Sequence, residues 1–269
     1  MQNALLVGLL ASVACGVVGS YVVARRITYI AGGISHSVLG GIGLAHYLIV
    51  VHGWQFLHPL HGAVVSAVIS ASIIGWVTLR AREREDTVIG AIWAVGMAVG
   101  ILFIAKTPGY NQDLMSYLFG NILMVTSTDV QLVGLLDIAV VVVGLVFYRH
   151  FQAVCFDEEF ARVRGVNVEF YYLLLLWMTA LTVVVLVSVV GIVMVIALIT
   201  LPVAIAGNFT KSLWQSMILS TVISMLLVIA GLAMSFGPDL PAGATIIMLA
   251  GGAYLLVTLA SGLRRRGTA

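Results

Sequence analysis

Charged residues are scarce in this sequence. Of its 269 residues, 9% are charged and 61% are hydrophobic, and the mean hydropathy is +1.13. Soluble domains carry about 25% charged residues, so this chain lacks the polar surface that a water-soluble fold needs. Apolar runs of about 20 residues, long enough to cross a bilayer, recur along the whole chain. Since hydrocarbon offers no partner to an exposed backbone amide, these runs predict an all-α integral membrane protein.

Further absences argue against catalysis. The sequence has no glycine-rich phosphate-binding loop, and its longest charged stretch, roughly 149–169, is too short for a nucleotide-binding domain. It also has no HExxH pattern and no serine–histidine–aspartate arrangement. The net charge of +2 argues neither for nor against nucleic acid, and we expect none as a partner. We therefore expect a transport protein rather than an enzyme, with any ATP hydrolysis on a separate chain.

The apolar segments predict a helical bundle of about eight or nine spans, with residues 1–269 forming one transmembrane domain. The first three residues carry no basic charge and no cleavage site, so we expect the first segment to be a true helix rather than a signal peptide. The stretch 110–124, which contains Asn111, Asp113, Ser116 and Tyr117, is predicted to be a shorter helix or a partial span. The predicted spans are residues 4–24, 28–51, 62–80, 87–105, 129–148, 170–188, 190–207, 213–235 and 243–262.

The basic residues predict the orientation of the bundle. Twelve of the 13 Lys and Arg residues fall on one side of the predicted spans, and only Lys106 falls on the other. Cytoplasmic loops carry an excess of Lys and Arg, so that side is expected to be cytoplasmic. The C-terminus is then inside and the N-terminus outside. The two cysteines, Cys15 and Cys155, lie at different predicted depths, so we expect packing residues rather than a disulfide.

An ionisable residue, His36, lies inside the second predicted span. It follows Arg26 by ten residues, which at helical rise places it about 15 Å deep, near the bilayer centre. In one interpretation its helical face is a small-residue packing seam, and the histidine makes a hydrogen bond between helices. In the other, the face lines a pathway and the imidazole binds a cation. The other residues on this face are Gly40, Gly43 and Tyr47.

A second ionisable residue, Asp137, lies at nearly the same predicted depth as His36. It precedes Arg149 by twelve residues, which corresponds to about 18 Å of helix. A carboxylate here either forms a hydrogen bond to a neighbouring helix or supplies half of a divalent-metal site together with His36.

Three histidines, His52, His58 and His61, cluster in an outer loop. Histidine-rich tracts can collect metal. The same loop contains Trp54 and Pro59, which are typical of an ordinary interfacial loop, and we favour that interpretation.

Four short stretches are weak motifs singly but specific in combination. In this order and spacing they resemble, over nearly the whole chain, the permease subunits of zinc/manganese-type metal-uptake ABC transporters, the ABC-3 family. The stretches are residues 19–26 with Ser35 and His36 and the glycines that follow, residues 116–120, residues 156–166, and the set 190–191, 201–202 and 240–244.

The resemblance implies the partners of the chain. They are a second copy of itself, two cytoplasmic ABC ATPase subunits, and an extracytoplasmic metal-binding protein, in the cell membrane of a prokaryote. No cofactor is expected to be bound permanently, because the metal ion is the transported cargo.

The resemblance also implies that residues 156–166, within a cytoplasmic segment of about 150–169, dock on the ATPase. The segment is short, charged and amphipathic, as a docking helix should be, although a solvated charged turn would look similar. The residues expected to carry this coupling are Asp157, Glu158, Phe160, Ala161 and Gly165.

One position departs from the family pattern. Members usually have an aspartate four residues before the histidine, and the two form the metal site, whereas this chain has Gly32. The histidine carries over to His36 and the carboxylate does not. Without that oxygen ligand, zinc is favoured over manganese or iron, because zinc accepts nitrogen ligands readily. Asp137 is a candidate for the missing carboxylate.

We therefore expect the permease subunit of an ATP-driven divalent-metal importer that works by alternating access at a homodimer interface. The first alternative is a permease for a metal chelate or another small solute, but the glycines around His36 favour close helices and a small ion. The second alternative, a membrane-embedded metalloenzyme, would need more convergent ligands than His36 and Asp137.

Overall fold

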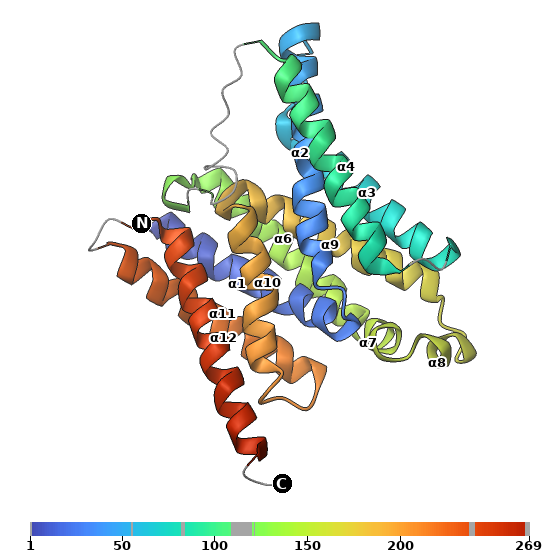
Figure 1. Cartoon of the computed structure of the whole chain (residues 1–269), viewed down its shortest axis with the longest axis vertical. Coiled ribbons are helices and arrows are strands. Elements are labelled where there is room, and N and C mark those ends of the chain that lie inside the picture. Colours follow the sequence, from blue (N-terminus) through green and yellow to red (C-terminus); the bar gives the residue numbers. More distant parts are fainter. Residues whose placement is uncertain are drawn as a thin grey trace.

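The structure is a computed structural model that describes residues 2–54, 56–81, 84–108, 120, 122–236 and 240–266. Every regular element in these ranges is a helix (Figure 1). The predicted partial span at 110–124 lies largely outside the described residues, and only Gly120 and the short turn η2 (Ile122–Met124) fall within them.

Eight helices of the described chain are long and apolar enough to cross a membrane. This confirms the prediction of an all-α integral membrane protein with eight or nine spans. The predicted span at 190–207 is a shorter apolar helix, α10 (Ile192–Ala206). The eight are α1 (Gln2–Arg25), α2 (Tyr29–His52), α3 (Pro59–Trp76) with its π-helical extension η1 (Val77–Ala81), α4 (Glu85–Lys106), α6 (Ser127–Val146), α9 (Val168–Val190), α11 (Leu213–Phe236) and α12 (Ala242–Arg266).

Two groups of helices make up the bundle. In the first, α2 packs against both α3 and α4. In the second, α1 contacts α6, α10 and α11, while α12 packs on α10 and α11 (Figure 1). Helix α9 lies between the groups, because it contacts α2 and α3 on one side and α1 and α6 on the other.

Glycines allow α2 and α4 to approach closely. A Cβ atom on Gly40 would lie 2.9 Å from the carbonyl oxygen of Gly96, and one on Gly43 would lie 2.9 Å from that of Gly100. Real Cβ atoms essentially never come within 3.0 Å of another heavy atom, so larger residues would separate the helices. Small residues at such contacts are typical of helix pairs in membranes, where close packing drives association.

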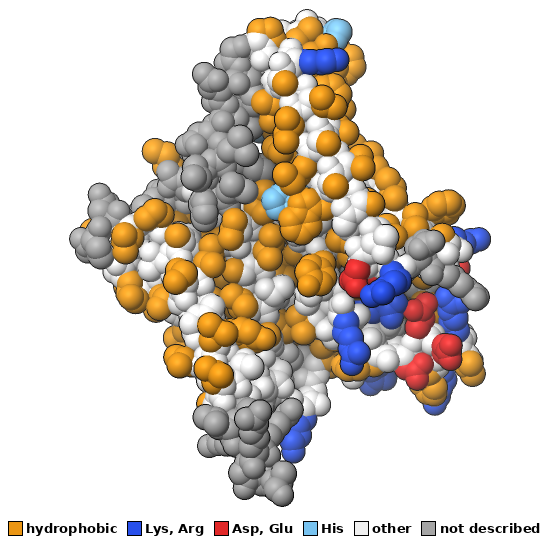
Figure 2. Space-filling model, viewed as in Figure 1, with side chains coloured by type: hydrophobic (Ala, Val, Ile, Leu, Met, Phe, Trp, Pro, Cys, Tyr) orange, Lys and Arg blue, Asp and Glu red, His pale blue; other side chains and the backbone are white. Residues whose placement is uncertain are grey.

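The segment predicted as one charged cytoplasmic stretch forms two short helices, α7 (Tyr148–Phe156) and α8 (Glu158–Val163). The break lies at Asp157, whose carboxylate accepts a hydrogen bond from the backbone N–H of Phe160 at 2.8 Å and so caps α8. Helix α8 is followed by Gly165, whose φ of 77° is the left-handed conformation that glycine adopts without strain. Figure 2 shows acidic and basic side chains gathered at the end of the molecule that carries these two helices.

Candidate functional site

His36 lies on α2 with its ring stacked on Trp93 of α4. The two ring planes are 10° apart and their centroids are 4.5 Å apart. The imidazole is half-buried. A face-to-face stack uses the flat side of the imidazole, so the edge that carries both ring nitrogens is not occupied by Trp93. His36 is therefore held in orientation by an aromatic neighbour while its ligating atoms point elsewhere.

His36 lies in the first third of α2. It comes seven residues after Tyr29, where α2 begins, so it lies about 10 Å along a helix that is about 36 Å long. The count from Arg26 that predicted its depth included the turn between α1 and α2. Along α2 itself, His36 lies nearer the N-terminal end than the middle.

The helical face beyond His36 is a packing seam. Gly40 and Gly43 contact α4 as described above, and the ring of Tyr47 lies 5.5 Å from that of Phe103 on the same helix. These three residues thus contact α4, as the packing interpretation expects. His36 and Trp93 stand at the end of this seam that is nearer the starts of α2 and α4.

Trp93 also occupies the space beside Gly32. A Cβ atom on Gly32 would lie 3.1 Å from Cζ3 and 3.5 Å from Cη2 of the Trp93 ring. The indole therefore covers the position at which a longer residue 32 would place its side chain next to His36. The absence of a side chain at Gly32 and the stack on His36 are thus linked, because one Trp93 ring takes part in both.

Asp137 belongs to a different part of the bundle from His36. It is buried, with 5% of its surface exposed, against Ala14 and Cys15 of α1. Helix α6 packs mainly on α1 and α9. The structure thus does not bring Asp137 to His36, which contacts α4 instead. Within the described ranges, no three His, Cys, Asp or Glu side chains gather as a metal-ion cluster.

Among the described residues, neither carboxylate oxygen of Asp137 has a well-formed hydrogen bond, and the backbone of Ala14 is only a weak polar neighbour. A buried carboxylate is costly in an apolar environment, and the structure keeps this one apart from His36.

The outer histidines have structural roles. The Nδ1 atom of His58 accepts a hydrogen bond from the N–H of Leu60, and the Nδ1 atom of His61 accepts one from the N–H of His58, both at 3.3 Å. The two side chains thereby cap the start of α3. The ring of His52 packs edge-on against Tyr47. These contacts agree with the interpretation of an ordinary interfacial loop.

Both cysteines are free and buried, as predicted. Burial raises the pKa of the Cys155 thiol to about 12, against the opposite effect of the nearby Arg25 charge. Cys155 is therefore a neutral packing residue.

Helix α8 presents a small apolar surface at the charged end of the molecule. Phe160 is 52% exposed and Val163 is 87% exposed, and the guanidinium of Arg164 lies 5.0 Å from the Phe160 ring centroid. Ala161 is fully buried, so it supports the helix and is not available to a docking partner. Asp157 and Gly165 define the two ends of the helix.

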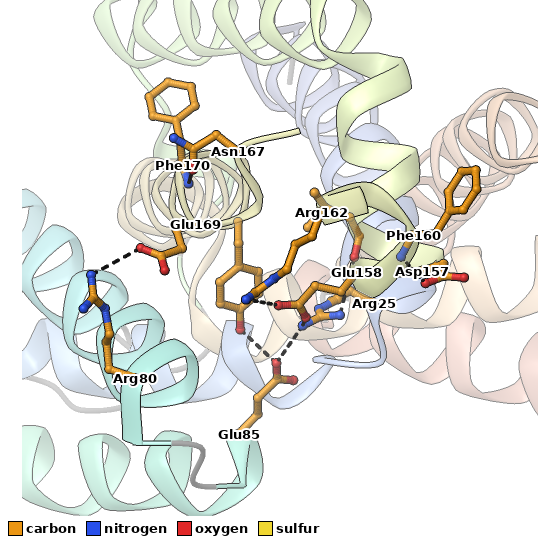
Figure 3. A network of polar contacts seen from close by, with 12 residues as sticks. Arg25, Arg80, Glu85, Asp157, Glu158, Phe160, Arg162, Asn167, Glu169 and Phe170 are labelled. Atoms are coloured by element: carbon orange, nitrogen blue, oxygen red, sulfur yellow. Dashed lines mark hydrogen bonds and ion pairs between the residues drawn. The ribbon is translucent and has the colours of Figure 1, made fainter. Parts of the chain in front are cut away.

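Glu158, the remaining predicted coupling residue, belongs to an ion-pair network around Arg25 (Figure 3). The Arg25 Nη2 atom lies 2.9 Å from Oε2 of Glu158 and 3.4 Å from Oε1 of Glu85. The same Glu85 oxygen accepts a hydrogen bond from the hydroxyl of Tyr172 at 3.0 Å. The other Glu158 oxygen pairs with Arg162 at 3.1 Å.

The sequence alone missed Trp93, Arg25 and Glu85 as site residues. Arg25 lies in the first stretch of the family resemblance and among the basic residues that predict the orientation, but neither feature indicated an ion pair with Glu85. No local pattern identifies Trp93, because its stack on His36 joins residues 57 positions apart in the sequence.

Two stretches that carry the family resemblance meet in the structure. A Cβ atom on Gly120, which ends the second stretch, would clash with the backbone of Val190 and Gly191 in the fourth. Gly191 separates α9 from α10 with a φ of 84°. Their close contact explains why glycine is needed at both positions.

Comparison with known proteins agrees with this architecture. The model of the ABC 3 transport family matches residues 1–261. A probable metal transport system membrane protein of Chlamydia trachomatis is 41% identical over 252 residues, which cover 93% of this chain and 85% of the relative. The manganese transport system membrane protein MntC of Halalkalibacterium halodurans is 32% identical over 256 residues, which cover 95% of this chain and 85% of the relative.

A solved structure extends the agreement to the fold. PsaBC from Streptococcus pneumoniae, in complex with a Fab, superimposes with a TM-score of 0.81 and 28% identity, covering 95% of this chain and 90% of that one. The family model spans residues 1–261, and the two relatives align with 93% and 95% of the chain. The chain therefore belongs to the ABC 3 transport family.

Proposed function

We propose that this chain is the membrane permease subunit of an ATP-driven importer of divalent metal ions. The observation that carries the proposal is the half-buried His36 inside α2, in a chain whose relatives are named as metal transport membrane proteins. An ionisable side chain within a membrane span is costly and marks a pathway by default.

His36 is the proposed ligand of the passing ion. A neutral imidazole binds transition metals through either ring nitrogen, and the stack on Trp93 restrains the ring while leaving its nitrogen-bearing edge free of that contact. In the proposed transport cycle, two copies of the chain form the pathway, and the ion passes His36 as they rock between inward and outward states.

Zinc is the proposed cargo on the chemistry of this site. Gly32 places no oxygen donor next to His36, and Trp93 covers the same space. Zinc accepts imidazole nitrogen readily, whereas manganese prefers carboxylate and carbonyl oxygen. Manganese is the specific alternative, because the relative from Halalkalibacterium halodurans is named as a manganese transport protein.

ATP hydrolysis is proposed to occur on two separate cytoplasmic ATPase subunits that dock on α8. The exposed Phe160 and Val163 supply apolar anchors within a charged rim, which is the composition of a helix that fits a groove. The concentration of charge at this end supports its placement in the cytoplasm, and the C-terminus would lie on the same side.

The test is metal import by the purified permease with its ATPase and its metal-binding protein in proteoliposomes. We expect ATP-dependent uptake that is lost in His36→Ala, while complex assembly stays normal. His46→Ala, on the same helix, is the control and should retain uptake. The proposal fails if the wild-type complex hydrolyses ATP without importing zinc, manganese or ferrous iron. Wild-type uptake by an assembled His36→Ala complex would refute the role of His36.

A further inference from the structure

Arg25 is the point at which the proposed docking helix meets the transmembrane helices. It is the last residue of α1, and 17% of its side chain is exposed. Besides its two carboxylate partners, it donates a hydrogen bond from Nη1 to the carbonyl oxygen of Val154 at 3.4 Å. Its guanidinium also lies 5.1 Å from the centroid of the Tyr172 ring. One side chain thus contacts α4, α7, α8 and α9.

The two carboxylates that Arg25 binds stand at the starts of two helices. Glu158 is the first residue of α8 and Glu85 is the first residue of α4 (Figure 3). Each is about a quarter exposed, and each has a second partner, Arg162 for Glu158 and Tyr172 for Glu85. Either carboxylate could therefore move away from Arg25 without losing all its hydrogen bonds. Such a shared cation can exchange partners without leaving either carboxylate unpaired.

A rigid turn connects Arg25 to α2. The N–H of Ile27 bonds to the carbonyl oxygen of Val22, and the N–H of Arg26 bonds to that of Val23, both at 3.0 Å. This is the Schellman arrangement, and Arg26 adopts the left-handed φ of 67° that it requires. Ile27 is buried at the turn. The position of Arg25 therefore fixes where α2 begins.

The helices that start at this junction carry the two stacked rings. His36 follows Tyr29 by seven residues on α2, and Trp93 follows Glu85 by eight residues on α4. Both rings thus lie about 10–12 Å from the junction along their helices. The close contact between α2 and α4 means that a shift at their cytoplasmic ends is transmitted to the stack.

We propose that Arg25 is the positioning residue that transmits movement of α8 to the metal-binding face of His36. When the ATPase displaces α8, Glu158 moves relative to Arg25. The paired contact with Glu85 then shifts the start of α4 against α2. This inference rests on the proposed function, because it assigns a route by which ATP binding changes the His36 site.

The experiment compares metal imported per ATP hydrolysed by the complete complex, with zinc and manganese as probes. In Arg25→Gln we expect normal assembly and continued ATP hydrolysis, with the import ratio reduced by about fivefold or more. Arg80→Gln is the control, because it removes an exposed ion pair with Glu169 at the same end of the molecule without touching Arg25. Its ratio should stay within about twofold of wild type.

A second set of variants keeps the test valid if Arg25→Gln does not assemble. Glu85→Gln and Glu158→Gln each remove one partner of Arg25. Because both act through the same guanidinium, the double variant should lower the import ratio much less than the product of the two single effects. The charge-swapped double variant, Arg25→Glu with Glu158→Arg, should import more metal per ATP hydrolysed than Arg25→Glu alone.

The possible outcomes separate this inference from the proposed function. A wild-type complex that imports no metal ion refutes the proposed function. A wild-type complex that imports metal, together with an assembled Arg25→Gln complex of unchanged ratio, refutes the role of Arg25 alone. Independent, multiplicative effects of Glu85→Gln and Glu158→Gln would refute it as well.

Discussion

Replacing Gly96 with alanine would insert a methyl group into the contact between α4 and α2. The new Cβ atom would lie 2.5 Å from Cα and 2.7 Å from Cβ of Ser37, the neighbour of His36. Ordinary van der Waals contact begins at 3.4 Å. Because backbone atoms cannot rotate away, α4 must retreat by about 1 Å. Trp93 lies one helical turn before Gly96, so the retreat should weaken its stack on His36.

Two opposing effects set the size of the change in stability. Alanine is favoured over glycine within a helix by about 1 kcal/mol. Overpacking a close contact costs about 1–3 kcal/mol. The control is Gly90→Ala on the same helix, where the added methyl group has no neighbour within 4 Å and only the first effect acts. The difference in unfolding free energy between the two variants isolates the packing cost, about 1–3 kcal/mol.

The assay is thermal unfolding of both variants in the same detergent, followed by tryptophan fluorescence, together with metal uptake. We expect Gly96→Ala to melt several degrees below Gly90→Ala and to import metal more slowly. Equal melting temperatures and equal uptake would contradict the close approach of α2 and α4 and its role in holding the stack.

Three further predictions concern single side chains. His36→Ala should abolish metal uptake while the variant still inserts and assembles, as measured by co-purification with the ATPase, and normal uptake would remove His36 from the pathway. Phe160→Glu should weaken ATPase binding or uncouple hydrolysis from uptake, whereas Phe209→Glu, also exposed and between α10 and α11, should not; equal effects would place the docking surface elsewhere. Asp137→Asn should leave uptake intact, because its helix packs on α1 and α9 in a different part of the bundle from His36; the uptake assay used for His36→Ala checks this. Lost uptake in Asp137→Asn would show that Asp137 takes part in transport.

The course of the helices could be predicted from the sequence because hydrocarbon imposes a minimum length and an apolar composition on each span. The predicted span 28–51 is observed as Tyr29–His52, and 213–235 as Leu213–Phe236. The predicted span 62–80 ends in a π-helical segment, Val77–Ala81, which hydropathy does not detect. The division between α7 and α8 depends on the side chain of Asp157 as a cap, which is a local signal that the composition of the segment obscured.

The candidate site was only partly predictable, for a different physical reason. His36 stood out because ionisable residues are rare within spans. Matching depths suggested Asp137 as its partner, but depth gives one coordinate and says nothing of which helices are neighbours. The structure places Trp93 beside His36 instead. Arg25 reaches carboxylates 60 and 133 positions away in the sequence, so its role emerges only from the fold.

The most direct test of the central claim is to locate the transported ion within the chain. Crystals or frozen complexes loaded with zinc, and separately with manganese, would be examined by anomalous scattering or by X-ray absorption at the metal edge. We expect a bound ion near a ring nitrogen of His36, at about 2.0–2.1 Å for zinc, and loss of that signal in His36→Ala. An ion bound elsewhere in a complex that imports it, with the His36 ring still stacked on Trp93 and unliganded, would show that His36 is not the ligand of the transported ion.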